Sequence, residues 1–202
     1  MKKRLLSLAL AFVLAFSLLP TAAWAAETDV SALPEFSKGA DTSTIQKFKI
    51  SSADSLKALA TAVKDNDGKG AYNLKGLTFY LANDIELSDT WTPISNVTYP
   101  ADAFAGTFDG NGHTISGLNG SNGLFGFVNG ATIKNLKVEG TISGPTTGIG
   151  GIVGKTQGKV TITNCSFTGS VSATNSGSSN AAGEIVGRGN AGTLTVENCA
   201  NH

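Results

Sequence analysis

The chain is poor in the residues that form metal sites and that attract polyanions. Its 202 residues include two histidines and two cysteines, and the zinc motif His-Glu-x-x-His is absent. The repeat described below places Cys165 and Cys199 in the core, so they cannot share a zinc ion with His113 and His202. Fifteen Lys and Arg residues balance fifteen Asp and Glu residues, which leaves no basic excess to draw nucleic acid or anionic lipid. We therefore expect no metal, no cofactor and no nucleic-acid partner.

Carboxylates suited to acid–base chemistry are few and scattered. Glycoside-cleaving enzymes and β-helical lyases need paired carboxylates or a calcium site on one face, and the calcium-binding repeat Gly-Gly-x-Gly-x-Asp is missing. The acidic candidates fall at different repeat positions: Asp102, Asp109, Glu139, Glu184 and Glu197. Asp109 is close to His113 in sequence, but Asp-Gly-Asn-Gly at 109–112 is a turn signal in which Asp bonds its own backbone. We therefore predict no catalytic residue and a non-enzymatic protein.

One long apolar run is present, and it lies at the N-terminus. Met1–Arg4 is basic, Leu5–Leu19 is apolar and uncharged, and Thr21–Ala26 is rich in small residues, with the cleavage signal Ala-Trp-Ala at 23–25. This order indicates a signal peptide over residues 1–26. A membrane anchor is the alternative, but the run is short for a span of roughly 20 residues. We expect a secreted or cell-wall-associated protein that does not insert into a membrane after cleavage.

Glycine, by contrast, is abundant, with 25 residues, and it recurs in a repeat. Within Phe104–Gly126, the phrase Asn-Gly-Leu-Phe-Gly ends at Gly126; it returns as Gly-Gly-Ile-Val-Gly ending at Gly154 and as Gly-Glu-Ile-Val-Gly ending at Gly187. A strand-like phrase follows each copy: Thr132–Leu136, Thr161–Cys165 and Thr195–Cys199, with an earlier, looser copy at Thr114–Leu118. A repeat of this size is one supersecondary unit, which buries its apolar face only by stacking on its neighbours.

Alternation within these phrases predicts which side chains face inward. Ile162, Cys165 and Phe167 point to the core, with a bend at Asn164. The matching positions of the neighbouring copies hold Ile133, Leu136 and Val138 on one side and Val196 and Cys199 on the other. Like residues then stack at the strand spacing of about 4.8 Å, and a hydrogen-bonded ladder at the bend links Asn135, Asn164 and Asn198.

This stacking predicts an all-β fold, a right-handed parallel β-helix (solenoid) over residues 104–202, with a β-sandwich as the alternative. The segments Pro145–Gly148 and Ala173–Ala182 differ in length and are expected to be loops on one side of the solenoid. The last phrase, Thr193–Asn201, supplies one strand and no cap. We therefore expect further chain to continue the stack there, or a second molecule to dock end to end.

Residues 49–103 are expected to cap the solenoid at its N-terminal end. Ser51 or Ser52 can begin an amphipathic helix within Ile50–Val63. The apolar face of that helix would hold Leu56, Leu59, Ala60 and Val63. A strand, a bend and a second strand follow over Leu77–Leu87, and Trp91 lies in a loop, where packing over the core edge is favoured over stacking on a sugar. Residues 27–48 are interpreted as a linker.

The two cysteines occupy equal positions of neighbouring copies. Their Cα atoms would lie about 4.8 Å apart, within the disulfide range of roughly 4.4–6.8 Å, and export permits oxidation. Two free buried thiols are favoured over a disulfide, because stacked side chains run parallel and must rotate to bond.

Together the phrases resemble the GLUG-type repeats of bacterial surface and secreted proteins, over residues 50–202. The glycine phrases carry the resemblance, with the entry phrase Phe104–Ile115 and the preceding Leu81–Ile85 and Trp91–Ile94. The resemblance implies a surface β-helix; such repeats occur in adhesin-like proteins and in the non-catalytic part of immunoglobulin A-cleaving metallopeptidases. It carries over no catalytic residue.

We therefore expect a non-enzymatic adhesion or display module that binds an extracellular protein or glycan. One alternative is a non-catalytic accessory region of a larger secreted polysaccharide-processing enzyme or peptidase. A passive spacer in a surface protein is another alternative, and a fold does not decide between such functions.

The signal peptide generates the first prediction. Because a basic start, an apolar core and a small-residue exit occur in the right order, the mature chain should begin near Ala26 or Glu27. Intact-mass spectrometry of the exported protein measures this directly, and a mass that retains residues 1–25 contradicts it.

Overall fold

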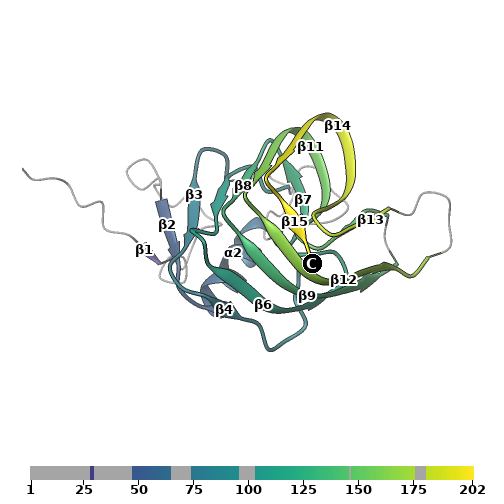
Figure 1. Cartoon of the computed structure of the whole chain (residues 1–202). Coiled ribbons are helices and arrows are strands. Elements are labelled where there is room, and N and C mark those ends of the chain that lie inside the picture. The colour runs from purple at the N-terminus through teal and green to yellow at the C-terminus, as the bar shows by residue number, and fades with distance from the viewer. Residues whose placement is uncertain (1–27, 30–46, 65–73, 96–102, 146, 176–180) are drawn as a thin grey trace, which may run out of the picture.

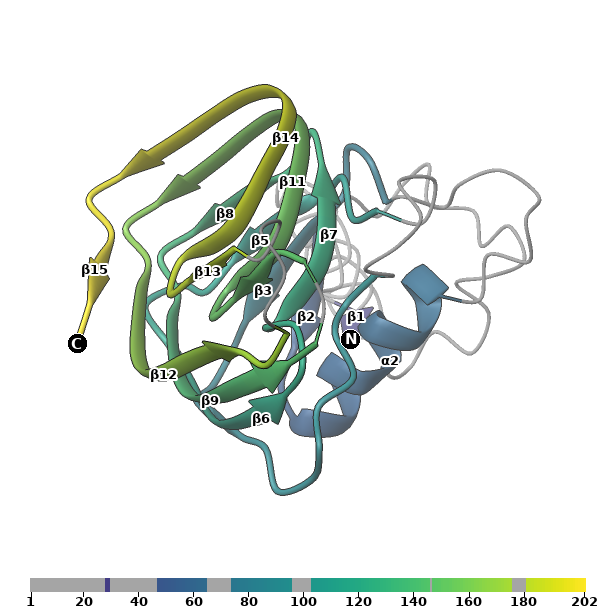
Figure 2. The same ribbon diagram turned by 90° about the vertical axis from the view of Figure 1, so that its right-hand side faces the viewer.

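The strands wind into a β-solenoid of about four turns (Figure 1). The computed structural model describes residues 28–29, 47–64, 74–95, 103–145, 147–175 and 181–202. Every described strand ladder is parallel, and successive turns wind in the right-handed sense that parallel crossovers favour (Figure 2). The predicted right-handed parallel β-helix is thus confirmed, and the β-sandwich alternative is wrong.

Two large sheets form the long faces of the solenoid. The eight-stranded sheet follows the order β1 (Thr28–Asp29), β2 (Lys47–Ile50), β3 (Thr78–Leu81), β5 (Thr107–Asp109), β8 (Thr132–Lys134), β11 (Val153–Thr163) and β14 (Val186–Glu197), with β7 (Phe125–Asn129) beside β11. The five-stranded sheet follows the order β15 (Ala200–Asn201), β12 (Ser166–Ala173), β9 (Lys137–Gly144), β6 (Thr114–Gly120) and β4 (Ile85–Glu86). A short third sheet pairs β10 (Ile149–Gly150) with β13 (Ala182–Gly183). Each turn passes from the eight-stranded sheet to the five-stranded sheet and back.

Like side chains stack in columns along the axis, as the repeat predicts. In the eight-stranded sheet one inward column holds Phe48, Phe79, Phe108, Ile133, Ile162 and Val196. Its first five members are at most 1% exposed, whereas Val196, on the last turn, is 44% exposed. In the five-stranded sheet a second buried column holds Ile85, Ile115, Val138 and Phe167. Members of these columns are therefore buried where a further turn or the N-terminal cap covers them.

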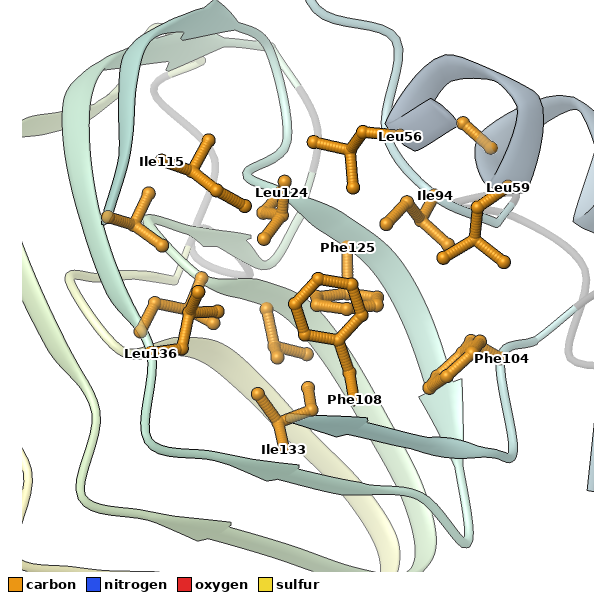
Figure 3. Close-up of a cluster of buried hydrophobic side chains, with 14 of the residues drawn as sticks. Leu56, Leu59, Ile94, Phe104, Phe108, Ile115, Leu124, Phe125, Ile133 and Leu136 are labelled. Carbon is orange, nitrogen blue, oxygen red and sulfur yellow. The ribbon is translucent and has the colours of Figure 1, made fainter. Parts of the chain in front are cut away.

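Aromatic rings fill the N-terminal half of this core. Phe48 stacks on Phe79 with 5.4 Å between ring centroids, and Phe125 lies 5.3 Å from both Phe104 and Phe108, edge-on to the latter. Figure 3 shows the rings of Phe104, Phe108 and Phe125 with the aliphatic side chains of Ile133 and Leu136 from the following turn. Rings in such offset and edge-on arrangements stabilise a core beyond the area that they bury.

The register corrects one detail of the sequence repeat. Thr114–Leu118 is not an earlier copy of Thr132–Leu136, because Thr114 pairs with Lys137 in the five-stranded sheet. The residue that stands in register with Thr132 is Thr107. Strands of both sheets alternate inward apolar and outward polar residues, so a Thr-Ile pair fits either sheet and its sequence alone does not say which.

The single described helix, α2 (Ala53–Lys64), covers the N-terminal end of the core. Its cap is Ser52, whose Oγ accepts a hydrogen bond of 3.2 Å from the backbone N–H of Ser55. The predicted apolar face is buried, namely Leu56, Leu59, Ala60 and Val63. In Figure 3, Leu56 and Leu59 reach from the helix toward Ile94 and the rings of the core. The predicted capping helix is confirmed.

The cap begins earlier in the chain than residue 49, the boundary expected from the sequence. The chain reaches the helix through β2, in which Phe48 and Ile50 are buried, so the helix starts after Ile50 rather than at it. Lys47 and Phe48, assigned to the linker, therefore belong to the sheet, and Thr28–Asp29 pairs with β2. The linker residues 30–46 lie outside the described part of the chain.

The bend between the two large sheets is built on asparagine. Asn135 and Asn164 both adopt φ of +53°, and Asn198 adopts +52°, a left-handed conformation that Asn tolerates better than most residues. The side-chain Nδ2 of Asn164 donates to Oδ1 of Asn135 (3.1 Å), and Nδ2 of Asn135 donates to Oδ1 of Asp109 (3.0 Å). The predicted ladder is confirmed for Asn135 and Asn164, and Asp109 begins it, which the sequence did not indicate.

The last turn leaves part of its inward face open. Leu194 and Val196 are 39% and 44% exposed, although their register partners Val160 and Ile162 are buried. The expectation that further chain or a second molecule covers this face stays a prediction.

The columns generate the second prediction. Ile162→Ala removes a fully buried side chain between two stacked neighbours and should cost about 2–5 kcal/mol in unfolding free energy. Val196→Ala, at the same column position on the open last turn, should cost less than about 1 kcal/mol. Urea unfolding followed by circular dichroism compares the two variants, and equal losses contradict the stacking description.

Candidate functional site

One corner of the solenoid changes length from turn to turn. Residues that are paired in register from turn to turn define the two sides of this corner. On the side where the chain enters the corner these are Trp91, Gly120, Ile142 and Val171. On the side where the chain leaves it they are Ile94, Phe125, Val153 and Val186. The segments between them are therefore residues 91–94, 120–125, 142–153 and 171–186, of which 146 and 176–180 lie outside the described residues. We name the described residues of these four segments the variable corner. Its connections lengthen steadily toward the C-terminal end.

The opposite bend keeps its length over the last three turns, after a longer form at residues 109–114 in the turn before. The eight-stranded sheet passes to the five-stranded sheet over Lys134–Lys137, Thr163–Ser166 and Glu197–Ala200, each with an asparagine at the same place. The expected loops Pro145–Gly148 and Ala173–Ala182 both fall at the variable corner, which confirms that they lie on one side of the solenoid. The segments 128–132, 156–161 and 189–195, at another corner, lengthen by only one residue a turn. The largest changes of chain length in these turns therefore fall at the variable corner.

Backbone hydrogen bonds between neighbouring turns, like those of the sheets, join the first and last residues of the long connections. The backbone N–H of Thr174 donates to the carbonyl of Gly144 (2.9 Å), and that of Ile149 donates to the carbonyl of Ala181 (2.8 Å). The side-chain amide of Asn175 bonds to the carbonyl oxygen of Pro145. Loops on a rigid base of this kind are a common location for binding residues.

The glycine phrases have a packing role at this corner. Gly123 has φ of +95°, and a Cβ placed on it would lie 2.2 Å from the carbonyl oxygen of Gly150 on the next turn. A Cβ on Gly150 would lie 1.9 Å from the carbonyl oxygen of Val153 on its own turn and 2.9 Å from the backbone nitrogen of Gly187 on the following turn. Backbones of neighbouring turns approach too closely here for any side chain. The phrases therefore shape the corner, and they supply no chemical group to it.

A groove of about 290 Å³ lies at the N-terminal end of the variable corner, between α2 and the segment before Ile94. It is lined by Lys57, Ala60, Thr61, Thr90, Trp91 and Thr92. Nζ of Lys57 lies 2.8 Å from Oδ2 of Asp89, and this hydrogen bond and the carboxylate charge raise the pKa of Lys57. The groove thus has hydroxyl groups and an exposed ion pair at its edge.

Trp91 packs into the core edge beside this groove. Its side chain is only 4% exposed, and its indole Nε1–H donates to the carbonyl oxygen of Leu124 (3.1 Å). A ring in this position has no free face for a sugar. The packing interpretation of Trp91 is confirmed.

Two cations meet on neighbouring turns just after the variable corner. Lys155 of β11 and Arg188 of β14 are register partners, the first half-buried and the second exposed. Burial lowers the pKa of Lys155, and the positive charge of Arg188 lowers it further. Gly148, at φ of +82°, lies against both, since a Cβ on it would be 2.9 Å from Cγ of Lys155 and 2.8 Å from Cβ of Arg188. Sequence reasoning missed this pair, although each residue directly follows a Val-Gly of the repeat.

The structure separates Asp109 and His113. Asp109 accepts a hydrogen bond from the backbone N–H of Asn111 (2.9 Å) and lies 3.2 Å from Nζ of Lys134. Burial acts to raise the pKa of Asp109, but hydrogen bonds from Asn135, Asn111 and Lys134 outweigh it and lower the pKa. Nδ1 of His113 instead lies 3.0 Å from Oδ1 of Asp84. The structural interpretation of Asp109 is thus confirmed.

The other acidic candidates do not converge. Glu139 is exposed on the five-stranded sheet, Glu184 contacts the side-chain amide of Asn201, and Glu197 occupies the outward column of Asp109 three strands further on. Asp102 lies outside the described residues. Within the described residues, no group of three or more His, Cys, Asp or Glu side chains is placed to hold a metal ion.

Both cysteines are free thiols in the structure, as favoured from the sequence, but only Cys165 is buried as expected. Cys165 is buried, and its Sγ donates to the carbonyl oxygen of Thr163 (3.2 Å). Burial raises the pKa of Cys165 to about 12, so its thiol is protonated at neutral pH and unreactive in the folded state. Cys199, on the last turn, is half-buried.

Comparison with protein families, curated proteins and solved structures gave no match. The resemblance to GLUG-type repeats therefore stays a prediction. Among the described residues, no helix is long and apolar enough to cross a membrane.

The variable corner generates the third prediction. Eight Gly and Ser residues inserted between Asn175 and Ala181 should cost only about 1 kcal/mol, because loop closure depends weakly on length. The same insertion between Asn164 and Cys165 should unfold the C-terminal turns, because it breaks the bend that sets both sheets in register. Thermal unfolding of the two variants gives the comparison. Equal tolerance at both places contradicts the division into a variable corner and a constant bend.

Proposed function

We propose that this protein is a non-enzymatic binding module, secreted or displayed at a cell surface, that uses its variable corner for adhesion. The observation that carries the proposal is that the largest changes of chain length in the last three turns fall at this corner. In solenoids, insertions of individual repeats lie on one face, and that face is often the binding face. The partner is an extracellular protein or a glycan. The predicted signal peptide supports export, and the resemblance to GLUG-type repeats supports a bacterial surface location.

The shape of the molecule supports adhesion through such a corner. The columns and the asparagine ladder make the turns a rigid support, and the loop bases are bonded into it. A ligand that contacts several turns at once then meets groups in a defined arrangement, which lowers the entropy cost of binding.

Two alternatives make different predictions for the corner. An accessory region of a secreted polysaccharide-processing enzyme or peptidase would also bind through exposed loops, and its ligand would be the substrate of that enzyme. A passive spacer would have no ligand at any corner. Dependence of binding on the corner therefore separates the first two functions from the third.

The fourth prediction tests the corner directly. The chain from residue 27 is compared with a variant that carries Pro145→Ala, Thr174→Ala and Asn175→Ala, three exposed residues of the variable corner. Binding to a glycan array and to immobilised mucin and fibronectin should fall at least about tenfold in the variant, which corresponds to 1.4 kcal/mol. A matched control carries Thr168→Ala and Ser170→Ala, both on the exposed face of β12, and should bind as the parent does.

The outcomes distinguish the functions. Equal binding by the corner variant and the parent would place the ligand elsewhere and overturn the proposal. Absence of binding to every surface would favour the passive spacer. Thermal unfolding of each variant checks that its solenoid is intact.

A further inference from the structure

We propose that the groove between α2 and residues 90–92 binds one neutral sugar unit of a glycan. This inference rests on the proposed binding function and names the ligand class for the N-terminal end of the variable corner, to which Trp91 and Thr92 belong. The hydroxyl groups of the sugar meet polar side chains on two walls of the groove, and a C–H face of the sugar lies over an apolar floor.

Polar side chains line both walls of the groove. On α2, Lys57 and Thr61 lie one helical turn apart on the same face, and both are exposed. On the opposite wall, Thr90 and Thr92 are exposed on either side of the buried Trp91. Each hydroxyl can donate one hydrogen bond and accept others, and the Lys57 ammonium carries three donors. The walls therefore offer donors and acceptors to a ligand with hydroxyl groups around its rim.

The wall opposite the helix is held in place by the next turn of the solenoid. The backbone N–H of Trp91 donates to the carbonyl oxygen of Asn119 (2.7 Å), and that of Ile94 donates to the carbonyl oxygen of Leu124 (2.9 Å). The helix is fixed in turn by its buried apolar face. Polar groups on walls of this kind are positioned before the ligand arrives, which lowers the entropy cost of binding.

The floor of the groove is small and apolar. Ala60 and Trp91 both line it, although they are only 5% and 4% exposed. Trp91 thus offers a contact to the ligand but no stacking face. The volume of about 290 Å³ is at the lower end of the roughly 300–1,000 Å³ that is usual for small-molecule sites, so it suits one ring better than a longer ligand.

The charges beside the groove favour a neutral ligand. Nζ of Lys57 lies 2.8 Å from Oδ2 of Asp89, and the negative charge of Asp54 also acts on Lys57. An anionic ligand would have to displace Asp89 from Lys57 and would be repelled by both carboxylates. Neighbouring hydroxyls of a neutral sugar can instead accept from the ammonium and donate to the carboxylate, so the ion pair stays intact.

The groove contains its own spectroscopic reporter. The chain has two tryptophans, and Trp24 lies in the predicted signal peptide, so Trp91 is the single tryptophan of the chain from residue 27. Because Trp91 lines the groove, a change in its fluorescence reports a ligand at this place rather than at the loops of later turns.

The test titrates the chain from residue 27 with the methyl glycosides of glucose, galactose, mannose and N-acetylglucosamine. Sodium glucuronate is the acidic counterpart, and each titration is repeated at low and physiological salt. Thr61→Val, Thr90→Val and Thr92→Val, alone and combined, remove hydroxyls and keep the side-chain shape. Ala60→Leu fills the groove from its floor. The matched control is Thr141→Val, on the exposed face of β9.

We expect at least one neutral glycoside to change Trp91 fluorescence in a saturable way that does not depend on salt, because a neutral ligand is not subject to screening. Glucuronate should leave the fluorescence unchanged. Each Thr→Val substitution should weaken binding between about twofold and tenfold, the usual effect of losing one hydrogen bond, and Thr141→Val should change it less than about twofold. Ala60→Leu should abolish binding.

Three outcomes would overturn the site. They are a fluorescence that no neutral glycoside changes, a triple Thr→Val variant that binds as the parent does, and glucuronate that binds more tightly than every neutral glycoside. Melting temperatures equal to that of the parent show that lost binding is not lost folding. If Ala60→Leu does not fold, the Thr→Val variants still decide, because those side chains are exposed and keep their shape.

Failure of this site and failure of the proposed function give different results. If the variant at Pro145, Thr174 and Asn175 loses binding to surfaces while the groove variants do not, the proposed function stands and only this site fails. If glycosides bind in the groove while the variant at Pro145, Thr174 and Asn175 binds surfaces as the parent does, the site stands and the proposed function of the corner fails.

Discussion

In-register parallel pairing is the constraint on which the rest of the structure depends. Because each strand lies on its counterpart of the previous turn, every inward position becomes a column of like side chains, such as Phe79, Phe108 and Ile133. No single turn has an interior of its own, so each column is buried only where a further turn or the capping helix covers it. Ile162 and Val196 show this: they share a column, yet one is fully buried and the other is 44% exposed.

The asparagine bend and the variable corner have different roles in the fold. At the constant bend, left-handed asparagines hydrogen-bonded from turn to turn set the relation between the two large sheets. A change of length there would move every inward side chain of the next strand to the outer face. At the variable corner, Gly123 and Gly150 bring the backbones together before the chain enters the next sheet, so the segment outside them can grow. Tolerance at one corner thus follows from strict spacing at the other.

Stacking also decides where charges meet. Outward columns bring residues of successive turns to the strand spacing of about 4.8 Å, whatever their distance in sequence. Asp109 and Lys134 meet in this way and form an ion pair, with Asn135 bonded to the same carboxylate. Lys155 and Arg188 meet by the same rule with equal charges. The first arrangement stabilises the sheet, and the second places two like charges on neighbouring strands.

The amino-acid sequence by itself determined the solenoid, the inward residues and the cap, because these follow from local periods: alternation in strands, Asn at bends, and an apolar stripe on a helix. It also indicated the packing of Trp91 and the free thiols. Only the tertiary structure decided which phrase stacks on which, since a Thr-Ile pair suits either sheet and Thr107, not Thr114, lies beside Thr132. It alone also paired His113 with Asp84 and Lys155 with Arg188. Those contacts depend on register between turns, which is set by all columns together and is not encoded near either residue.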